Sequence, residues 1–344
     1  MATAGVTGDG GTSRATAGPT GPSGTTGSTA GPAGASRTAA TTREARPAAP
    51  LVAAIVVNWN GAAITRRCVE SLLRDQGVDL RVLVVDNASQ AEDRTELRRW
   101  CGDKPGVTLL ELDENRHFAG GVNAGARQAL ELGASHLVFL NNDTELEPGC
   151  LREMVEASLA DPRVGIVGPA LLDLHSRNAL SLGERYGLRT LAVPRTLLRV
   201  RRAGSGEPYP VGGVMGSVIL VTARCFREAG PYREDLLVYH EEVDFCLRAR
   251  RAGFQARIAP RAIALHDGLR GMTSGLTAYA GYLKARNPLL IARALARPLD
   301  WACLLPIHVA IVLLSAALHV ARCQAAVAAS LLRGLRDGLL GRAG

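Results

Sequence analysis

The sequence predicts an α/β fold built around a mainly parallel sheet. Hydrophobic residues make up 47% of the 344 residues, which is enough to form a buried core. Short apolar runs rich in β-branched residues recur along the chain, and segments of helical periodicity separate one run from the next. Strands that alternate with helices at this spacing are typical of βαβ units, whose strands lie parallel.

The individual elements follow from hydrophobic periodicity. A short continuous apolar run indicates a buried strand, and apolar residues that recur every three or four positions indicate a helix. The expected strands are 51–57, 80–85, 107–112, 136–140, 164–167 and 216–221. The expected helices are 64–77, 92–100, 122–132, 145–160, 222–229 and 241–252.

The N-terminal residues 1–50 differ from the rest in composition. They contain 10 Gly, 5 Pro, 12 Ala and 11 Thr, and Val6 is their only sizeable aliphatic residue after the initiator. Because burial of such a segment cannot offset the entropy lost on ordering, we expect a disordered arm. No apolar stretch of the length of a secretory signal occurs in it.

The C-terminal part is strongly apolar. Residues 301–320 contain no Asp, Glu, Lys or Arg, and about twenty such residues suffice to span a bilayer. Pro306, His308 and His319 interrupt this run, and a second run at 325–332 is too short to span. Three alternatives stay open for 291–344: a spanning helix, helices that lie on an anionic membrane surface, or packing within a soluble protein or homo-oligomer.

The charge of +8 is unevenly distributed. The segment 51–283 is neutral, and the excess lies in residues 1–50 and 284–344. A nucleic-acid-binding body is therefore disfavoured, and we expect a cytoplasmic protein that is peripheral to, or anchored at, the inner face of the cell membrane. The seven cysteines form no CxxC pair, which argues against a zinc ribbon or a disulfide scaffold and for reduced thiols.

Polar clusters follow three of the expected strands. They are Asn58-Trp59-Asn60-Gly61, Asp86-Asn87 and Asn141-Asn142-Asp143. In an open parallel sheet, ligands bind at the carboxyl ends of the strands. No phosphate-binding P-loop or dinucleotide-binding glycine motif is present, but glycines at 120–125 would let a ligand approach the N-terminus of the helix at 122–132.

Six motifs in series resemble those of family 2 glycosyltransferases, and most closely the bacterial rhamnosyltransferase-like subset. The resemblance covers about 51–290, and His266 and Arg286-Asn287 extend it. The motifs are IVVNWNG (55–61), VVDNAS (84–89), ENRHFAGGVNAG (114–125), FLNNDT (139–144), GGVMGS (212–217) and YHEEVDFCLR (239–248).

The resemblance implies a GT-A fold, a Rossmann-like fold that binds nucleotide-diphospho-sugars, in residues 51–290. It implies a nucleotide-sugar donor, held by residues at the strand ends and on the helix at 122–132. Trp59 would either lie beside the base or fill the core. Arg286-Asn287 is a possible phosphate contact. The expected donor-binding residues are Asn58, Trp59, Asn60, Asp86, Asn87, Gly121, Asn123 and Asn142.

The resemblance further implies a divalent metal, Mg²⁺ or Mn²⁺, beside the donor diphosphate. Asp143 stands where the family places the metal-binding carboxylate of its Asp-x-Asp motif, and His266 stands where some relatives place a further ligand. The triplet departs from the family pattern because Asn141 and Asn142 are neutral. An ordinary turn aspartate and a structural histidine are the alternative interpretations.

The general base is expected among the acids at 241–244. The family pattern here is Glu-Asp-x-Asp, whose second acid takes the proton of the acceptor hydroxyl, and Glu242 holds that place. Glu241 and Asp244 are the alternatives. Acids at the start of a helix are also stabilised by the helix dipole without any catalytic role.

The predicted function is an inverting, metal-dependent glycosyltransferase. Rhamnose is the leading donor sugar, and the acceptor is a hydroxyl of a surface polysaccharide, cell-wall or lipid-linked glycan. Two other classes stay open. The depleted triplet at 141–143 is compatible with a non-catalytic nucleotide-sugar-binding or assembly subunit. A nucleotidyltransferase would share the α/β core but lacks a charged glycine-rich loop after the first strand.

Overall fold

The computed structural model describes residues 50–191, 206–267 and 276–343. The arm expected at 1–50 lies outside these residues except for Pro50, as does most of the arginine-rich stretch 189–202. Arg189 is described, and its Nε lies 3.0 Å from Oδ1 of Asp300.

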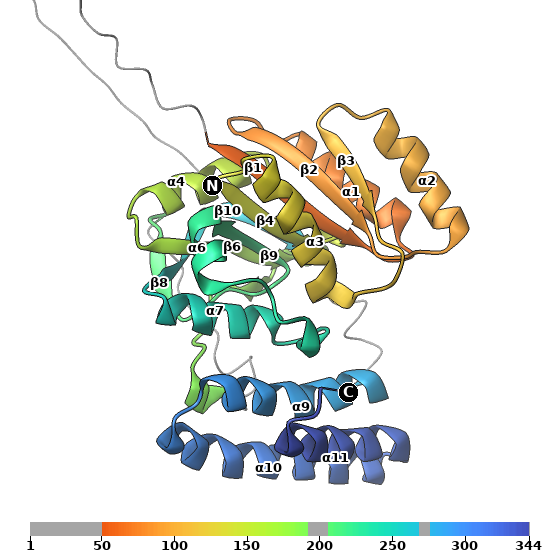
Figure 1. The fold of residues 1–344 in the computed structure, drawn as a ribbon, viewed down its shortest axis with the longest axis vertical. Coiled ribbons are helices and arrows are strands. Elements are labelled where there is room, and N and C mark those ends of the chain that lie inside the picture. The colour runs from red at the N-terminus through yellow and green to blue at the C-terminus, as the bar shows by residue number, and fades with distance from the viewer. Residues whose placement is uncertain (1–49, 192–205, 268–275, 344) are drawn as a thin grey trace, which may run out of the picture. The chain divides into compact units, whose positions relative to one another are not determined.

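A ten-stranded sheet forms the centre of the described chain (Figure 1). Eight strands follow the order β3-β2-β1-β4-β9-β6-β10-β5, while β7 pairs with β6 and β8 pairs with β10. The strands are β1 (Leu51–Asn58), β2 (Asp79–Asp86), β3 (Val107–Glu111), β4 (His136–Asn141), β5 (Thr144–Leu146), β6 (Val164–Asp173), β7 (Ala179–Ser181), β8 (Tyr209–Val211), β9 (Val218–Thr222) and β10 (Gln255–His266).

The first half of the sheet is parallel and brings three strand ends together. β1 pairs in parallel with β2 on one side and with β4 on the other. Asn58 lies opposite Asp86, and Val57 lies opposite Asn141. The chain order reverses at β1, which is the place where open α/β sheets bind ligands.

The second half of the sheet joins β10 to the end of β4. β9 is antiparallel to β4 and β6, and β10 runs parallel to β6. β5 follows β4 after a short turn and pairs antiparallel with β10, so that Thr144 lies opposite His266. The sheet therefore places the last residue of β10 beside the turn that contains Asp143.

Helices cover both faces of the sheet. The helices are α1 (Ala62–Leu73), α2 (Ala91–Gly102), α3 (His117–Glu131), α4 (Cys150–Leu159), α6 (Ala223–Ala229), α7 (Glu241–Arg251), α9 (Ala278–Leu295), α10 (Pro298–Ala321) and α11 (Ala325–Leu340), with short 3-10 turns η1 (Leu188–Thr190) and η2 (Glu234–Leu236). Along β1, Val52, Ala54 and Val56 pack with α1, α2 and α4. Ala53 and Ile55 face the opposite cluster, which includes α3, α6 and α7.

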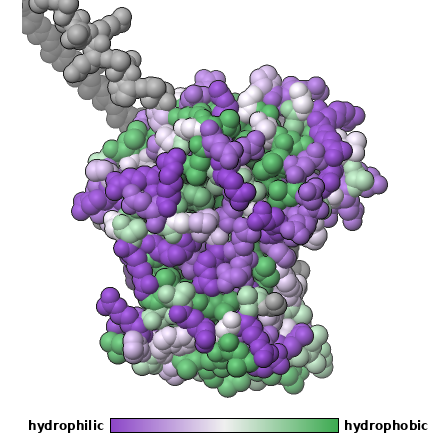
Figure 2. Space-filling model, viewed as in Figure 1, coloured by the Kyte–Doolittle hydropathy of each residue, from purple (hydrophilic) through white to green (hydrophobic). Residues whose placement is uncertain are grey.

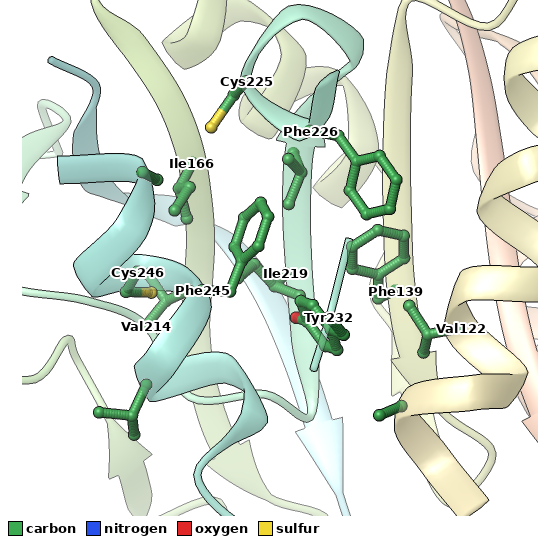
Figure 3. Packing of buried hydrophobic residues seen from close by; sticks show 14 of the residues in the cluster. Val122, Phe139, Ile166, Val214, Ile219, Cys225, Phe226, Tyr232, Phe245 and Cys246 are labelled. Atoms are coloured by element: carbon green, nitrogen blue, oxygen red, sulfur yellow. The ribbon is translucent and has the colours of Figure 1, made fainter. Parts of the chain in front are cut away.

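An aromatic cluster fills the core beneath α7. The rings of Tyr232 and Phe245 have centroids 5.3 Å apart, and Phe139 contacts Tyr232 edge-on at 5.4 Å. Figure 3 shows Phe226 beside Phe139, between the strands and the helices. Burial of these rings fixes α7 against the sheet.

Several elements differ from the prediction. β6 extends to Asp173, and β7, β8 and β10 have no counterpart among the predicted strands. The segment expected to be one helix over 145–160 is the strand β5 followed by α4. α3 begins at His117, five residues before the predicted start, so Gly120 and Gly121 lie inside the helix.

The glycines of α3 serve helix packing. A Cβ at Gly121 would lie 2.8 Å from Cγ1 of Val57, and one at Gly125 would lie 2.5 Å from Cγ2 of Ile55. The missing side chains let α3 lie close to β1. The expectation that Gly121 opens a helix N-terminus to a ligand is therefore wrong.

Three C-terminal helices form a layer of their own (Figure 1). α9 passes through residue 290, the expected domain boundary, and packs against both the core and α11. α10 turns one stripe inward, formed by Leu304, His308, Val312 and Ala316. Within 50–191, 206–267 and 276–343, α10 is the one helix that is long and apolar enough to cross a membrane.

Candidate active site

Asn58 connects the strand ends at the centre of the site. Its side chain is fully buried, and its Nδ2 lies within 3.1 Å of acceptors on Asp86, Ser89 and Asp93. Its Oδ1 accepts a hydrogen bond of 2.7 Å from Thr65 Oγ1. Asn58 thus holds α1 and the loop after β2 in place around the end of β1.

The β2 end is stabilised by an ion pair and by amide hydrogen bonds. The buried carboxylate of Asp86 lies 3.0 Å from Nε of Arg94. Asn87 donates to Oδ1 of Asn115 and to the carbonyl of His117, and its own Oδ1 accepts from the backbone N–H of Arg116. Asn87 therefore fixes the loop that leads into α3.

The residues after Asn58 face outward. Trp59 is 59% exposed, so the interpretation as a core residue is wrong. Asn60 has a φ of 53°, a left-handed conformation that asparagine tolerates. Its N–H donates to Ser89 Oγ, and its Oδ1 accepts from the N–H of Gln90. An exposed ring on a fixed turn is a suitable platform for stacking a base.

Asn142 joins the same cluster from β4. Its Nδ2 donates to Thr65 Oγ1 over 3.0 Å, and Thr65 in turn donates to Asn58. A Cβ on Gly61 would lie 2.9 Å from that nitrogen. The structure thus brings together Asn58, Asn60, Asp86 and Asn142, which lie on three different strand ends.

Asp143 and His266 meet at the same edge. Oδ1 of Asp143 is shielded from solvent and lies 3.1 Å from Nε2 of His266. Apart from this contact with His266, the oxygen has no hydrogen-bond partner among the residues that the structure describes. The N–H of Asp267 donates to the carbonyl of Asp143, which fixes the two segments together.

This pair fits a hard divalent cation. The one neighbour of this shielded oxygen is an imidazole nitrogen, which donates only when it carries a proton, so a cation bound between the two side chains would neutralise the carboxylate. No third His, Cys, Asp or Glu joins the pair within the described ranges. Mg²⁺ and Mn²⁺ sites of nucleotide enzymes commonly use one or two protein ligands, with phosphate and water oxygens filling the other positions.

The acids of α7 are connected to the triplet through the segment before β9. Glu241, Glu242 and Asp244 are all buried in its first turn. Side-chain carbons of Glu242 lie 3.3–3.5 Å from the Cβ position of Gly216. The carbonyl of the next residue, Ser217, accepts from the N–H of Asn141. Glu242 is therefore packed against the Gly216-Ser217 segment, which is bonded to Asn141, two residues before Asp143.

Asp244 has a structural environment. It is fully buried, and Oδ2 accepts a hydrogen bond of 2.7 Å from Nε of Arg248. Its Oδ1 lies 3.8 Å from NH1 of Arg233. Two guanidinium groups thus hold this carboxylate in ion pairs within the protein.

Asn123 lies apart from the donor cluster. Its buried amide donates to the Tyr232 carbonyl and to Oε1 of Glu234, and its Oδ1 accepts from the N–H of Tyr232. The side chain therefore anchors the loop before η2, and nothing in its contacts directs it toward the strand ends.

Arg286 and Asn287 also differ from the expectation of a phosphate contact. Both are fully buried, and they donate to backbone carbonyls of residues 235–239. Sequence reasoning missed Thr65, Asp93 and Arg94 as members of the site. Asp93 and Arg94 look like ordinary surface residues of a polar helix, and only the pairing of β1 with β2 reveals their partners.

The family comparison decides the class of this site. The model for "Glycosyl transferase family 2" matches residues 53–216, and that for "Glycosyl transferase family group 2" matches 136–332. The chain belongs to glycosyltransferase family 2. The family 2 glycosyltransferase expected from the motifs is thereby confirmed.

Two relatives are similar to this chain over comparable lengths. The low-salt glycan biosynthesis hexosyltransferase Agl10 of Haloferax volcanii is 27% identical over 62% of this chain and 67% of its own length. The N-acetylglucosaminyl-diphospho-decaprenol L-rhamnosyltransferase of Mycobacterium tuberculosis is 25% identical over 63% of this chain and 76% of its own. These relatives support the rhamnosyltransferase-like kind.

Solved structures confirm the GT-A fold. The mannosyltransferase PcManGT of Pyrobaculum calidifontis, in complex with GDP-Man and Mn²⁺, aligns with a TM-score of 0.54 at 19% identity, over 85% of this chain and 87% of that one. GalNAc-T7, with UDP, GalNAc and Mn²⁺, aligns with a TM-score of 0.51 at 16% identity, over 63% of this chain and 43% of that one.

Proposed function

We propose that this family 2 glycosyltransferase transfers a sugar, with inversion, from a nucleotide-sugar donor to a hydroxyl of a glycan acceptor. One observation carries the proposal. It is the closeness of the α7 acids and the Asp143–His266 pair at one edge of the sheet. Glu242 packs against Gly216, the neighbouring Ser217 is bonded to Asn141, and Asp143 lies 3.1 Å from His266, near the ends of β1 and β2. An inverting transfer needs a base and a cation site close to the same donor.

Glu242 would act as the general base. It takes the proton of the acceptor hydroxyl while that oxygen attacks C1 of the sugar and the bond from C1 to the diphosphate oxygen breaks. Attack opposite the leaving group inverts the anomeric centre. Glu242 is preferred to Asp244 because Arg248 and Arg233 neutralise the latter.

Asp143 and His266 would hold a divalent cation beside the diphosphate. When bound, such a cation neutralises the negative charge that develops on the departing nucleoside diphosphate. The chain itself contributes the shielded oxygen of Asp143 and fixes His266 through the pairing of β10 with β5.

The nucleoside would lie over the ends of β1 and β2. The exposed ring of Trp59 offers a stacking surface, and Asn60 presents its backbone turn next to it. The polar residues at the strand ends would shape this binding surface, since their hydrogen bonds hold the surrounding loops. These residues are Asn58, Asp86, Asn87 and Asn142. Gly121 and Asn123 are not among the proposed donor-binding residues.

A rhamnosyl donor and a lipid-linked acceptor are the leading substrates. Two relatives are named for rhamnose, the mycobacterial enzyme above and the dTDP-rhamnosyl transferase RfbF of Shigella flexneri. The mycobacterial enzyme is also named for a diphospho-decaprenol acceptor. An acceptor embedded in a bilayer would require the enzyme to work at a membrane surface.

The C-terminal layer supports such a location. α10 exposes Leu299, Ile307, Leu313, Leu314 and Leu318, between 42% and 64% each. Figure 2 shows apolar surface gathered on the layer where Figure 1 places α10 and α11. We infer that these helices lie on the cytoplasmic membrane surface and do not cross the bilayer. The inward stripe of α10 packs against α9 and α11, and this packing keeps α10 within the helical layer.

A panel of nucleotide sugars tests the function. Each donor is incubated with Mn²⁺ or with EDTA and a synthetic diphospholipid-linked N-acetylglucosamine, and nucleoside diphosphate release is measured. We expect metal-dependent release that is fastest with dTDP-rhamnose. Tight donor binding without turnover for any sugar would indicate a non-catalytic nucleotide-sugar-binding subunit instead.

A further inference from the structure

The segment before α7 has an unusual backbone. Leu237, Tyr239 and His240 have φ values of 65°, 68° and 71°, although none is glycine. At Leu237 the ψ is −74°, and the N–H of Val238 donates to the carbonyl of Leu236 over 2.8 Å. This is the rare and strained form of the γ-turn. Side chains other than glycine hold such conformations only when the surroundings impose them.

Asn287 of α9 imposes this conformation through one amide group. Its Nδ2 lies 2.9 Å from the carbonyl oxygen of Leu236, 3.1 Å from that of Val238 and 2.7 Å from that of Tyr239. These three carbonyls lie in a turn, where no regular ladder can satisfy them. The amide thus gathers the carbonyls on both sides of Leu237 around one point.

Arg286 completes the arrangement. Its NH2 donates to the carbonyl of Asp235 over 2.9 Å and lies 3.4 Å from that of Leu236. Its Nε donates to Oδ1 of Asn287 over 3.0 Å, which fixes the orientation of the amide. Arg286 is one of the largest fully buried side chains in the described residues.

The strained turn leads directly into the acids. His240 is the N-cap of α7, its carbonyl accepts from the N–H of Asp244, and Glu241 and Glu242 follow it. Any relaxation at Leu237 or Tyr239 would rotate this first turn. Glu242 is the second residue of this turn, so its carboxylate would move with it.

We propose that Arg286 and Asn287 are positioning residues, which hold the strained turn at 236–240 and thereby aim the carboxylate of Glu242. The inference rests on the proposed function for its kinetic consequence. Its structural half, the restraint of residues 236–240 by Asn287, stands independently of that function.

Asn287→Ser tests the proposal by separating an effect on kcat from an effect on the donor Kd. The shorter side chain loses at least two of the three bonds, so kcat should fall at least about tenfold while the donor Kd stays within about twofold, as misplacement of a base predicts. His308→Leu is the matched control. It removes another buried donor to an α9 carbonyl, that of Ala285 at 2.7 Å, but this bond does not involve residues 236–240, so the change should leave kcat within about twofold.

Leu237→Gly distinguishes positioning from general packing. Glycine adopts positive φ without strain, so this change should recover at least about threefold of the kcat lost by Asn287→Ser. An absence of kinetic recovery in the double variant would overturn the proposal.

Hydrogen exchange measures the restraint of residues 236–242 directly and requires no enzyme activity. In Asn287→Ser, amides of residues 236–242 should exchange at least about tenfold faster, and those of α10 should be unchanged. If no donor supports turnover, the proposed function fails while this measurement still decides the restraint. Unchanged exchange at 236–242, or an equal loss of kcat in His308→Leu, would contradict the proposal.

Discussion

At the scale of single residues, the triplet at the end of β4 carries a single carboxylate, that of Asp143, because Asn141 and Asn142 are neutral. The resemblance to family 2 enzymes predicted Asp143 and His266 as metal ligands although 123 positions separate them, and the structure places them 3.1 Å apart. Asp143 follows the predicted strand at 136–140, whereas His266 rested on the resemblance alone, and the pairing of β5 with β10 brings the two together. Asn123 shows the limit, since its partners Tyr232 and Glu234 are more than 100 residues away.

Asp143→Asn should weaken metal binding. The change keeps the shape of the side chain but removes the negative charge beside His266. We expect the affinity for Mn²⁺ in the presence of nucleoside diphosphate to fall at least about tenfold, measured by electron paramagnetic resonance titration. Asp75→Asn, at a buried carboxylate that accepts from the N–H groups of Gly149 and Leu151, is the control. An unchanged titration for Asp143→Asn would exclude it as a ligand.

At the scale of elements, strand and helix patterns predicted the first half of the sheet closely. β1, β2, β3 and β4 lie within two residues of the predicted strands. The β5 strand was missed because its pairing partner is β10, more than 100 residues later, and three residues alone carry no reliable period. The start of α3 was missed because Gly120 and Gly121 suggest a loop, whereas close packing on β1 requires them.

His136, at the start of β4, makes stability pH-dependent. Its Nε2 lies 2.9 Å from Ser158 Oγ, and burial lowers its pKa to about 4. Since this lies below the unfolded value near 6.5, the unfolded chain binds the proton first, and stability falls as the pH drops from about 6.5 to 4.

His136→Gln should remove this dependence. Between pH 6 and 4.5, the free energy of unfolding falls with pH in both proteins. We expect the slope of the wild type to exceed that of the variant by about 1 kcal/mol per pH unit, measured by urea denaturation. His319→Gln, at an exposed histidine bonded to Gln324, should keep the wild-type slope. Parallel slopes for wild type and His136→Gln would refute the assignment.

At the scale of the whole molecule, the basic excess and the apolar surface occur in the same part of the chain. The segment 284–344 carries eight Lys and Arg against two Asp, and Arg322, Arg333, Arg336 and Arg342 are exposed. Composition predicted this apolar segment, but not which face of α10 points outward. That depends on the inward stripe from Leu304 to Ala316, which contacts helices far along the chain.

Replacement of Leu313 and Leu314 by Ser should weaken membrane binding. Both leucines are at least 50% exposed on α10, and loss of their burial in a bilayer should lower partition into phosphatidylglycerol vesicles at least about tenfold, measured by co-sedimentation. Leu159→Ser, at an equally exposed leucine of α4, should leave partition unchanged. Equal binding by the double variant and the wild type would refute the membrane surface at α10.

The turnover of Glu242→Gln tests the central claim most directly. The amide keeps the size of the side chain against Gly216 but cannot accept the proton of the acceptor. With dTDP-rhamnose or the best donor of the panel, kcat should fall at least about 100-fold, with the donor Kd and the Tm kept. Glu241→Gln should lose far less. A kcat for Glu242→Gln within about threefold of wild type would contradict Glu242 as the base and the mechanism built on it.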